Sequence, residues 1–402
     1  MKYVIILGDG MADLPVKELG DKTPLMCADK KNIDALARFS EIGLIKTVPD
    51  SLSPGSDTAN LSVMGYDPEI YYSGRSPLEA VSIGVELGEN DSAFRCNLVT
   101  LSDEENYCDK TMLDYSSDEI TTEESGELIE FIKQHIETDI IKLYKGISYR
   151  HCLKWQGLKE SVQCTPPHDI TNKKISAFLP KGAEGSYLTA IMEKSYKLLG
   201  SHPVNIKRVK RGLNPANSLW LWGQGYKPSL KPFKELYGLD GAVISAVDLV
   251  KGIGICAGMK IINVKGATGN LNTNYKGKAD AAVKALKECD FVYLHIEAPD
   301  ECGHRQQIYE KIRAIELIDK IVVKRVLSGL KKTGEPFVLL ITSDHPTPLS
   351  TRTHSREPVP YLLYRSNKPL DNKFSYDEQG AKQSGNYIDK GHTMINKMLM
   401  EQ

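Results

Sequence analysis

Three continuous apolar runs along the chain predict buried strands. They cover residues 3–8, 290–296 and 337–342, and each run is followed by polar residues or glycine. Apolar runs without alternation are typical of parallel strands that are covered on both faces of a sheet. Because ligands bind beyond the carboxyl ends of such strands, we expect the polar residues that follow the three runs to meet at one site.

A helical spacing of apolar residues separates the last two runs. Between residues 307 and 330, isoleucine, valine and leucine recur every three or four positions, which predicts a crossover helix. Residues 281–286 precede the run at 290–296 in the same way. The pattern therefore predicts an α/β fold whose mainly parallel sheet is flanked by helices.

The middle of the chain has a different texture. Short strand-like segments, such as residues 94–101 and 147–155, alternate there with polar stretches and prolines. A chain of 402 residues also exceeds the length at which one hydrophobic core usually stops growing. We predict a smaller inserted α+β domain at residues 88–211, and a core domain formed by residues 1–87 and 212–402.

The overall charge excludes several classes of partner. Lysine and arginine number 51 against 52 aspartate and glutamate, so no general attraction to nucleic acid or anionic membranes is expected. The eight cysteines are scattered without a Cys-x-x-Cys pair, as in reduced intracellular proteins. No apolar run is long enough for a signal peptide or a membrane span. We expect a soluble cytoplasmic protein, and the sequence leaves a homo-oligomer open.

Carboxylate and imidazole side chains follow all three apolar runs. Each could be a helix cap or a hydrogen-bonded loop residue on its own, but their joint placement at strand ends predicts a metal site. Mixed oxygen and imidazole donors suit Mn²⁺ or Zn²⁺, and the histidines make Mg²⁺ less favoured. The candidate ligands are Asp9, Asp300, His304, Asp344, His345 and His354.

Ser56 is the candidate nucleophile. It lies in Pro54-Gly55-Ser56-Asp57, a segment that predicts a loop leading into a helix. The alternative is that Ser56 only caps this helix. Near a metal ion and the helix N-terminus, however, its hydroxyl would be activated and a phosphate attached to it would be stabilised. With two ions, the set predicts phosphoryl transfer, and we favour the nucleophile.

The order of these residues resembles that of the archaeal-type, cofactor-independent phosphoglycerate mutases of the alkaline-phosphatase superfamily. The matching segments are residues 8–13, 53–57, 214–225 and 343–348. The resemblance implies an alkaline-phosphatase-like core and a glycolytic interconversion of 2-phosphoglycerate and 3-phosphoglycerate through a phosphoserine, without 2,3-bisphosphoglycerate. It also implies two divalent ions, one bound by Asp300, His304 and His354, and one by Asp9, Ser56, Asp344 and His345.

The resemblance further implies that the inserted domain binds the phosphoglycerate. Arginine suits this role because it can hold phosphate or carboxylate through two hydrogen bonds, and a histidine could shuttle protons. The alternative for each residue is an ordinary surface charge or a hydrogen-bonded loop histidine. The candidate substrate-binding residues are Arg95, Arg150, His151, His168 and Asp169, with Lys251 of the core as a weaker candidate.

One segment departs from the family pattern. Residues 108–114 stand where the resembled mutases have an arginine-rich segment. A substrate with fewer negative charges would fit this change, so the alternative function is a homoserine kinase-like phosphotransferase of threonine biosynthesis that uses the same Ser56 chemistry. A further alternative is a non-catalytic binding protein in which metal ions only stabilise the fold.

Overall fold

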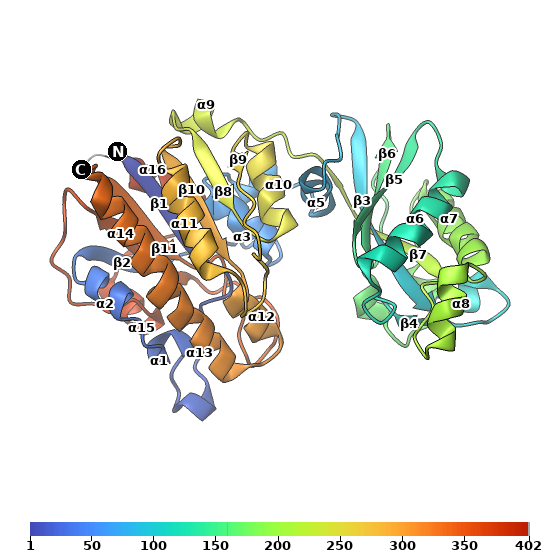
Figure 1. Cartoon of the computed structure of the whole chain (residues 1–402), viewed down its shortest axis with the longest axis horizontal. Coiled ribbons are helices and arrows are strands. Elements are labelled where there is room, and N and C mark those ends of the chain that lie inside the picture. Colours follow the sequence, from blue (N-terminus) through green and yellow to red (C-terminus); the bar gives the residue numbers. More distant parts are fainter. Residues whose placement is uncertain (159, 401–402) are drawn as a thin grey trace. The chain divides into compact units, whose positions relative to one another are not determined.

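The computed structural model describes residues 1–158 and 160–400, and the chain forms two compact units. The core unit comprises Met1–Tyr72 with Ser229–Gln402, and the inserted unit comprises Ser73–Pro228 (Figure 1). Each unit has its own cluster of buried apolar side chains. The inserted unit extends beyond both ends of the predicted segment 88–211. Helix Ser76–Ser82 contacts strand Asp91–Leu101, and strand Ser218–Tyr226 pairs with that same strand.

The core unit is built on an eight-stranded sheet in the described part of the chain. The strand order is β13-β2-β12-β11-β1-β10-β8-β9. The central strand β1 pairs in parallel with β10 and β11, so Tyr3 lies opposite both Phe291 and Val338. The bounds are β1 Lys2–Gly8, β2 Ser40–Ile45, β8 Gly241–Ile244, β9 Lys260–Ile261, β10 Phe291–Ile296, β11 Phe337–Thr342, β12 Val359–Arg365 and β13 Tyr387–Ile388.

The three predicted strands are confirmed as β1, β10 and β11, and the sheet is mainly parallel as predicted. Among the described strands of this sheet, only β12 runs antiparallel to its neighbours, which are β11 and β2. Helices α11 (Tyr275–Ala285), α13 (Ile308–Leu317) and α14 (Lys324–Thr333) lie along one face of the sheet (Figure 1). The opposite face packs against α3, since the Tyr293 hydroxyl donates to Asn60 of that helix. Cover on both faces explains why these strands show no apolar-polar alternation.

The predicted crossover helix at residues 307–330 is interrupted. It consists of α13 (Ile308–Leu317), a π-helical segment η5 (Ile318–Val323) and α14 (Lys324–Thr333). The widened turn of η5 holds the buried Asp319, whose carboxylate accepts hydrogen bonds from the backbone N–H groups of Asn32 and Ile33. The interruption therefore coincides with the point where Asp319 binds the first turn of helix α2 (Lys31–Ala37).

The remaining helices of the core unit are short. The one predicted at residues 281–286 is confirmed as part of α11. Within the described residues, no helix has the length and apolar character that a membrane span requires. The bounds are α1 Pro24–Cys27, α2 Lys31–Ala37, α3 Ser56–Val63, α4 Pro68–Tyr71, α9 Phe233–Tyr237, α10 Asp248–Cys256, α11 Tyr275–Ala285, α12 Ala298–His304, α15 Glu378–Ser384 and α16 Met394–Leu399.

The inserted unit is an antiparallel sheet with helices. Its strands follow the order β4-β3-β6-β5, and β7 pairs with the free side of β3. The predicted strands at 94–101 and 147–155 are confirmed as β3 and β6 with shifted ends. The bounds are β3 Asp91–Leu101, β4 Met112–Asp114, β5 Ile141–Ile147, β6 Arg150–Gln156, β7 Ser218–Tyr226, α5 Ser76–Ser82, α6 Thr122–Ile136, α7 Gly185–Leu199 and α8 Pro203–Lys210.

Candidate metal centre

The carboxyl ends of β1, β10 and β11 lie side by side and bring the predicted ligands together. Asp9 directly follows β1, and Asp344 lies two residues beyond the end of β11. Asp300 and His304 lie one helical turn apart on α12, which begins just after β10. Because the three strands are adjacent and parallel, side chains far apart in the sequence converge on one edge of the sheet.

A first group of ligand atoms comes from Asp300, His304 and His354. The Nε2 atoms of the two histidines lie 3.0 Å apart. The Asp300 carboxylate lies 3.3 Å from His304 Nε2 and 3.5 Å from His354 Nε2. All three side chains can thus direct one ligand atom each at a common point.

A second group surrounds Nε2 of His345. This nitrogen lies 3.1 Å from Ser56 Oγ and 3.3 Å from Asp344 Oδ2. It also lies 3.8 Å from Asp9 Oδ1. Asp300 joins Asp9 and His345 in a further set of close ligand atoms, so the two groups are neighbours.

Buried negative charge gathers at this place. Burial, reinforced by Asp344 and Asp300, raises the pKa of Asp9 well above its ordinary value. Asp9 Oδ1 is buried without a hydrogen-bond partner in the described part of the chain. Crowded carboxylates and an unpartnered buried oxygen fit a divalent cation, which would offset the repulsion and satisfy that oxygen.

The histidines differ in their protonation. Burial lowers the pKa of His345, so its ring is neutral at pH 7 and offers a lone pair. The hydrogen bond to Asp300 raises the pKa of His304 to about 9. Burial raises the pKa of Asp300, but hydrogen bonds with His304 and His354 outweigh this and hold the pKa well below its ordinary value. A cation bound there would displace the His304 proton.

The placement of Ser56 bears on the helix-cap alternative. Gly55 is the N-cap residue of α3, Ser56 is the first helical residue, and no side-chain cap bond is found at this end among the described residues. The buried Ser56 hydroxyl instead lies beside His345 Nε2. The capping alternative is therefore wrong, and the hydroxyl faces the candidate ligands.

Three further residues support the site and were not predicted. Asn60 donates to Asp344 Oδ2 at 2.9 Å and to the Ser56 carbonyl oxygen at 2.8 Å. His295 Nε2 lies 2.9 Å from Asp9 Oδ2. Thr347 Oγ1 donates to Asp300 Oδ1 at 2.5 Å. Two of them carried a usable pattern in the sequence: Asn60 lies one helical turn after Ser56, and His295 is a histidine within an apolar run.

In the inserted unit, some of the predicted substrate-binding residues form a cluster around Trp222. The guanidinium group of Arg95 lies 4.2 Å from the centre of the Trp222 ring, and its Nε lies 2.9 Å from Glu79 Oε2. The His168 ring packs edge-on against the same tryptophan at 5.4 Å. Arg150, which is exposed, lies over the ring of Tyr149.

Of the other predicted substrate-binding residues, Asp169 adjoins this cluster, His151 lies on the other face of the sheet, and Lys251 belongs to the core unit. His151 pairs with Cys96 on β3, so strand alternation directs it to the face opposite Arg95. Its ring accepts a hydrogen bond from Gly146 N–H, and burial lowers its pKa to about 3. Asp169 is exposed beside His168. Lys251 lies on α10 of the core unit, and its Nζ is 3.2 Å from Asp248 Oδ1.

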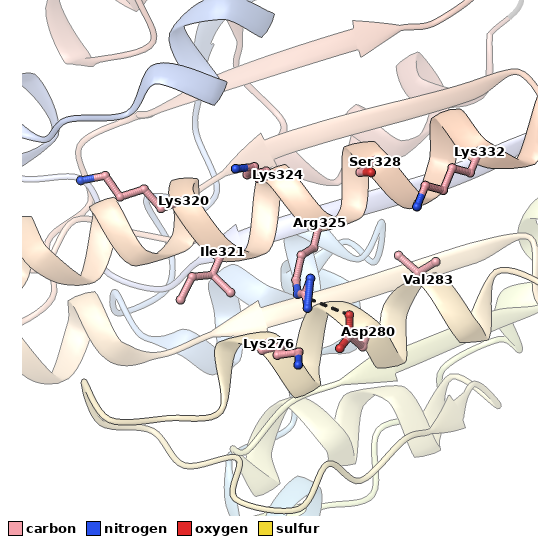
Figure 2. Close-up of a pocket in the computed structure, with 10 residues that line it drawn as sticks. Lys276, Asp280, Val283, Lys320, Ile321, Lys324, Arg325, Ser328 and Lys332 are labelled. Carbon is pink, nitrogen blue, oxygen red and sulfur yellow. Dashed lines mark ion pairs between the residues drawn. The ribbon is translucent and has the colours of Figure 1, made fainter.

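A separate groove of about 640 Å³ lies between α11 and the run of η5 and α14. Figure 2 shows Arg325 and Asp280 facing each other across it, 3.5 Å apart. None of the predicted ligands or substrate-binding residues is among the described residues that line the groove. Its lining residues are Lys276, Asp280, Val283, Lys320, Ile321, Lys324, Arg325, Ser328, Gly329 and Lys332.

Known proteins match the chain along its length. A family model described as 2,3-bisphosphoglycerate-independent phosphoglycerate mutase matches residues 37–205. A protein of that name from Methanosarcina mazei is 48% identical over 401 residues, which cover 99% of this chain and 100% of the relative. Another protein of that name, from Methanothrix thermoacetophila, is 50% identical over 399 residues, which cover 99% of this chain and 100% of the relative.

Solved structures share the fold. The PH0037 protein from Pyrococcus horikoshii has a TM-score of 0.83 and 30% identity, covering 100% of this chain and 98% of that chain. The cofactor-independent phosphoglycerate mutase from Thermoplasma acidophilum has a TM-score of 0.68 and 24% identity, covering 99% of both chains. The matches therefore extend through both units.

Proposed function

The chain belongs to the family of 2,3-bisphosphoglycerate-independent phosphoglycerate mutases, and we propose from this premise that it interconverts 2-phosphoglycerate and 3-phosphoglycerate through a phosphoserine at Ser56. The observation that supports this most is the buried Ser56 hydroxyl, which lies 3.1 Å from His345 Nε2, a nitrogen that is also close to the carboxylates of Asp344 and Asp9. Homoserine phosphorylation is not favoured, because the full-length relatives are named mutases.

We propose two divalent ions for this site, with Mn²⁺ first and Zn²⁺ or Mg²⁺ as alternatives. When bound, the ions would lower the pKa of the Ser56 hydroxyl and offset the charge on the phosphoryl oxygens. Support comes from the carboxylate crowding around Asp9 and from its unpartnered oxygen. The proposed ligands are Asp300, His304 and His354 for one ion, and Asp9, Ser56, Asp344 and His345 for the other.

The proposed reaction needs no outside phosphoryl donor. Ser56 Oγ attacks the phosphorus of 2-phosphoglycerate, the bond from phosphorus to the C2 oxygen breaks, and that oxygen takes the proton that Ser56 loses. The C3 hydroxyl of the retained glycerate then attacks the phosphoserine. The bond between Oγ and phosphorus breaks, the proton of the C3 hydroxyl returns to Ser56, and 3-phosphoglycerate leaves.

Neighbouring side chains hold the reacting serine in place. Ser56 opens α3, so the positive end of the helix dipole favours the phosphate that it carries. Asn60 fixes the backbone of Ser56 and the carboxylate of Asp344 with one amide group. His295 fixes Asp9 and is itself held by the Ser245 hydroxyl at 3.1 Å. Such supporting contacts commonly change metal affinity or activity by about 10- to 100-fold when they are removed.

We propose that Arg95, Arg150 and His168 bind the phosphate and carboxylate of the substrate. The packing of Arg95 and His168 against Trp222 limits their side-chain freedom and supports this assignment. The roles of Asp169, Lys251 and His151 stay predictions. We also propose a cytoplasmic location, since all eight cysteines are free thiols, as in a reducing compartment.

Coupled turnover of 3-phosphoglycerate with Mn²⁺, in the absence of 2,3-bisphosphoglycerate, tests the proposal. We expect activity in the wild-type chain and a loss of at least about 10³-fold in Ser56→Ala, because no other hydroxyl replaces the nucleophile. Metal content and melting temperature of the variant serve as controls and should stay close to wild type, apart from the loss of one oxygen ligand.

Two results would contradict the proposal, one on the substrate and one on Ser56. A metal-loaded wild-type chain without mutase turnover, but with ATP-dependent phosphorylation of homoserine, would establish the kinase alternative. A Ser56→Ala variant with unchanged turnover would remove Ser56 from the mechanism. Isotope-labelled glycerate should not enter the product, because the glycerate stays bound between the two transfers.

A further inference from the structure

Two loops of the core unit carry candidate ligands, and a buried lysine lies between them. Lys311, on α13, is fully buried. Its Nζ donates to the carbonyl oxygen of Ala12 at 3.3 Å, in the loop that follows Asp9, and to that of Thr347 at 2.8 Å, in the loop that follows His345. A third bond, of 2.6 Å, goes to Asp13 Oδ2. All three ammonium protons are therefore used.

Asp13 completes the connection from the opposite direction. Besides its bond with Lys311, its carboxylate accepts from the Leu349 backbone N–H at 3.2 Å, in the second loop. It also accepts from its own neighbour Leu14 at 2.8 Å. Lys311 and Asp13, here called the anchoring pair, thus tie each loop to the other through charged groups that bind backbone atoms.

The anchoring pair is connected through the two loops to candidate ligands that it does not itself contact. Thr347, whose carbonyl group binds Lys311, uses its hydroxyl to bind Asp300 Oδ1 and lies 3.3 Å from His345 Nδ1. Asp9 lies four residues before Asp13 in a loop that is itself bonded to the second loop at Pro346. A displacement of either loop would therefore change the separation of Asp9, Asp300 and His345.

Stability alone does not account for such a pair. Taking two charges out of water costs several kcal/mol per ion. Buried ion pairs can often be replaced by apolar residues without loss of stability. What an apolar pair cannot do is bind two carbonyl groups and a backbone N–H at defined distances. The function of the anchoring pair must therefore be sought in loop geometry.

We propose that Lys311 and Asp13 are positioning residues that set the spacing of the metal ligands for phosphoryl transfer. The inference rests on the proposed function for its catalytic readout. Its metal-binding readout does not depend on the substrate, so a chain that binds Mn²⁺ but lacks mutase activity would reject the proposed function and still test the anchoring pair.

The test compares Lys311→Met with the double variant Lys311→Met/Asp13→Asn in the full-length chain. The single variant leaves a buried carboxylate unpaired, so its melting temperature should fall. The double variant carries no unpaired charge and should regain most of that loss. If the pair positions the loops, the double variant still binds Mn²⁺ about 10-fold or more weakly, and its kcat falls about 10- to 100-fold. Calorimetric titration of the metal-free chain and coupled turnover measure the two quantities.

A matched control is Asp319→Asn. Asp319 is also buried, lies in the same helical run and holds backbone N–H groups, but those belong to α2. We expect this variant to lose stability while its Mn²⁺ affinity stays within about twofold of wild type. Recovery of both Mn²⁺ affinity and kcat in the double variant would overturn the inference.

Asp13→Asn alone covers the case in which the methionine variants do not fold. The amide fills the same volume but has one acceptor oxygen, so it can accept either from Lys311 or from the Leu14 and Leu349 N–H groups. A several-fold weaker Mn²⁺ affinity is expected. The melting temperature should also fall, because the buried Lys311 ammonium loses its counter-ion, but the two carbonyl groups that bind Lys311 remain. Unchanged affinity would again overturn the positioning role.

Discussion

Glu378 makes the stability of the core unit depend on pH. Its carboxyl group accepts from the Asp13 N–H at 3.0 Å and from the Thr23 hydroxyl at 2.6 Å. Burial raises its pKa from 4.5 to about 7. Between these two values the folded state binds more protons than the unfolded state, so this group's contribution is largest below pH 4.5 and is lost as the pH rises toward 7.

Glu378→Gln should remove this dependence. The amide keeps an acceptor for Asp13 N–H and a donor for Thr23, but it does not ionise. We expect the variant to gain stability relative to wild type as the pH rises from about 4.5 to 8, by at most on the order of 3 kcal/mol. Urea unfolding of the metal-free proteins at both pH values measures the difference. The same change in the free energy of unfolding with pH in wild type and variant would contradict the prediction.

At the same scale, the sequence predicted which side chains end the strands but not what holds them. Asp9, Asp300 and Asp344 stand out because each follows an apolar run. The partners of such residues come from distant segments, as His295 does for Asp9 and Lys311 for Asp13. Nothing local marks these pairs, because their contacts exist only once the strands are in register.

Among the elements, the seam between α11 and α14 depends on one glycine. A Cβ atom on Gly329 would lie 2.4 Å from Val283 Cγ2, so any larger residue must push the two helices apart. Both residues line the groove of Figure 2, away from the candidate ligands. The close approach of these helices therefore requires the absence of a side chain at this position.

Gly329→Ala should destabilise the chain without changing its chemistry. We expect a loss of about 1–3 kcal/mol in the free energy of unfolding, as for other overpacked positions, and near wild-type turnover. Thermal and urea unfolding measure the loss. Ser328→Ala, an exposed neighbour on the same helix, is the control and should be nearly neutral. Equal stability of the two variants would show that the helices can separate at little cost.

Element prediction succeeded where one pattern continued without a break. The unbroken apolar runs fixed the three central strands because burial on both faces leaves no other pattern. The run at 307–330 was predicted as one helix, whereas η5 interrupts it. Apolar residues continue at helical spacing through η5, at Ile318, Val322 and Val326, so the sequence pattern does not reveal the π-helical segment. The bonds of Asp319 to the backbone of α2 are a tertiary contact, which no local pattern shows.

For the whole molecule, two hydrophobic clusters imply two separate responses to metal removal. The repelling carboxylates lie in the core unit alone. Chelation should therefore speed hydrogen exchange in β1, β10 and β11 and leave β3 and β6 of the inserted unit unchanged. With free Mn²⁺ at a hundredfold its dissociation constant, the stabilisation that is lost amounts to about 2.7 kcal/mol. Faster exchange in both units to the same extent would contradict this.

Asp9→Asn provides the control for that experiment. The amide relieves the repulsion with Asp344 and Asp300 and also removes a proposed ligand. Its metal-free core unit should exchange more slowly than the metal-free wild type, and Mn²⁺ should add less protection. An exchange pattern equal to wild type, with and without metal, would exclude Asp9 from the ion site.

The position of β1 at the centre of the sheet also matters while the chain is being made. Tyr3 is synthesised long before its partners Phe291 and Val338, which come nearly three hundred residues or more later in the chain. At 5–20 residues per second, roughly 15 to 60 s pass before either neighbour exists. During that time the strand Lys2–Gly8 has apolar side chains and open backbone groups but nothing native to pair with. An apolar strand with unpaired backbone groups is a template for pairing with other chains, so this segment must be kept apart from them until β10 and β11 have been made.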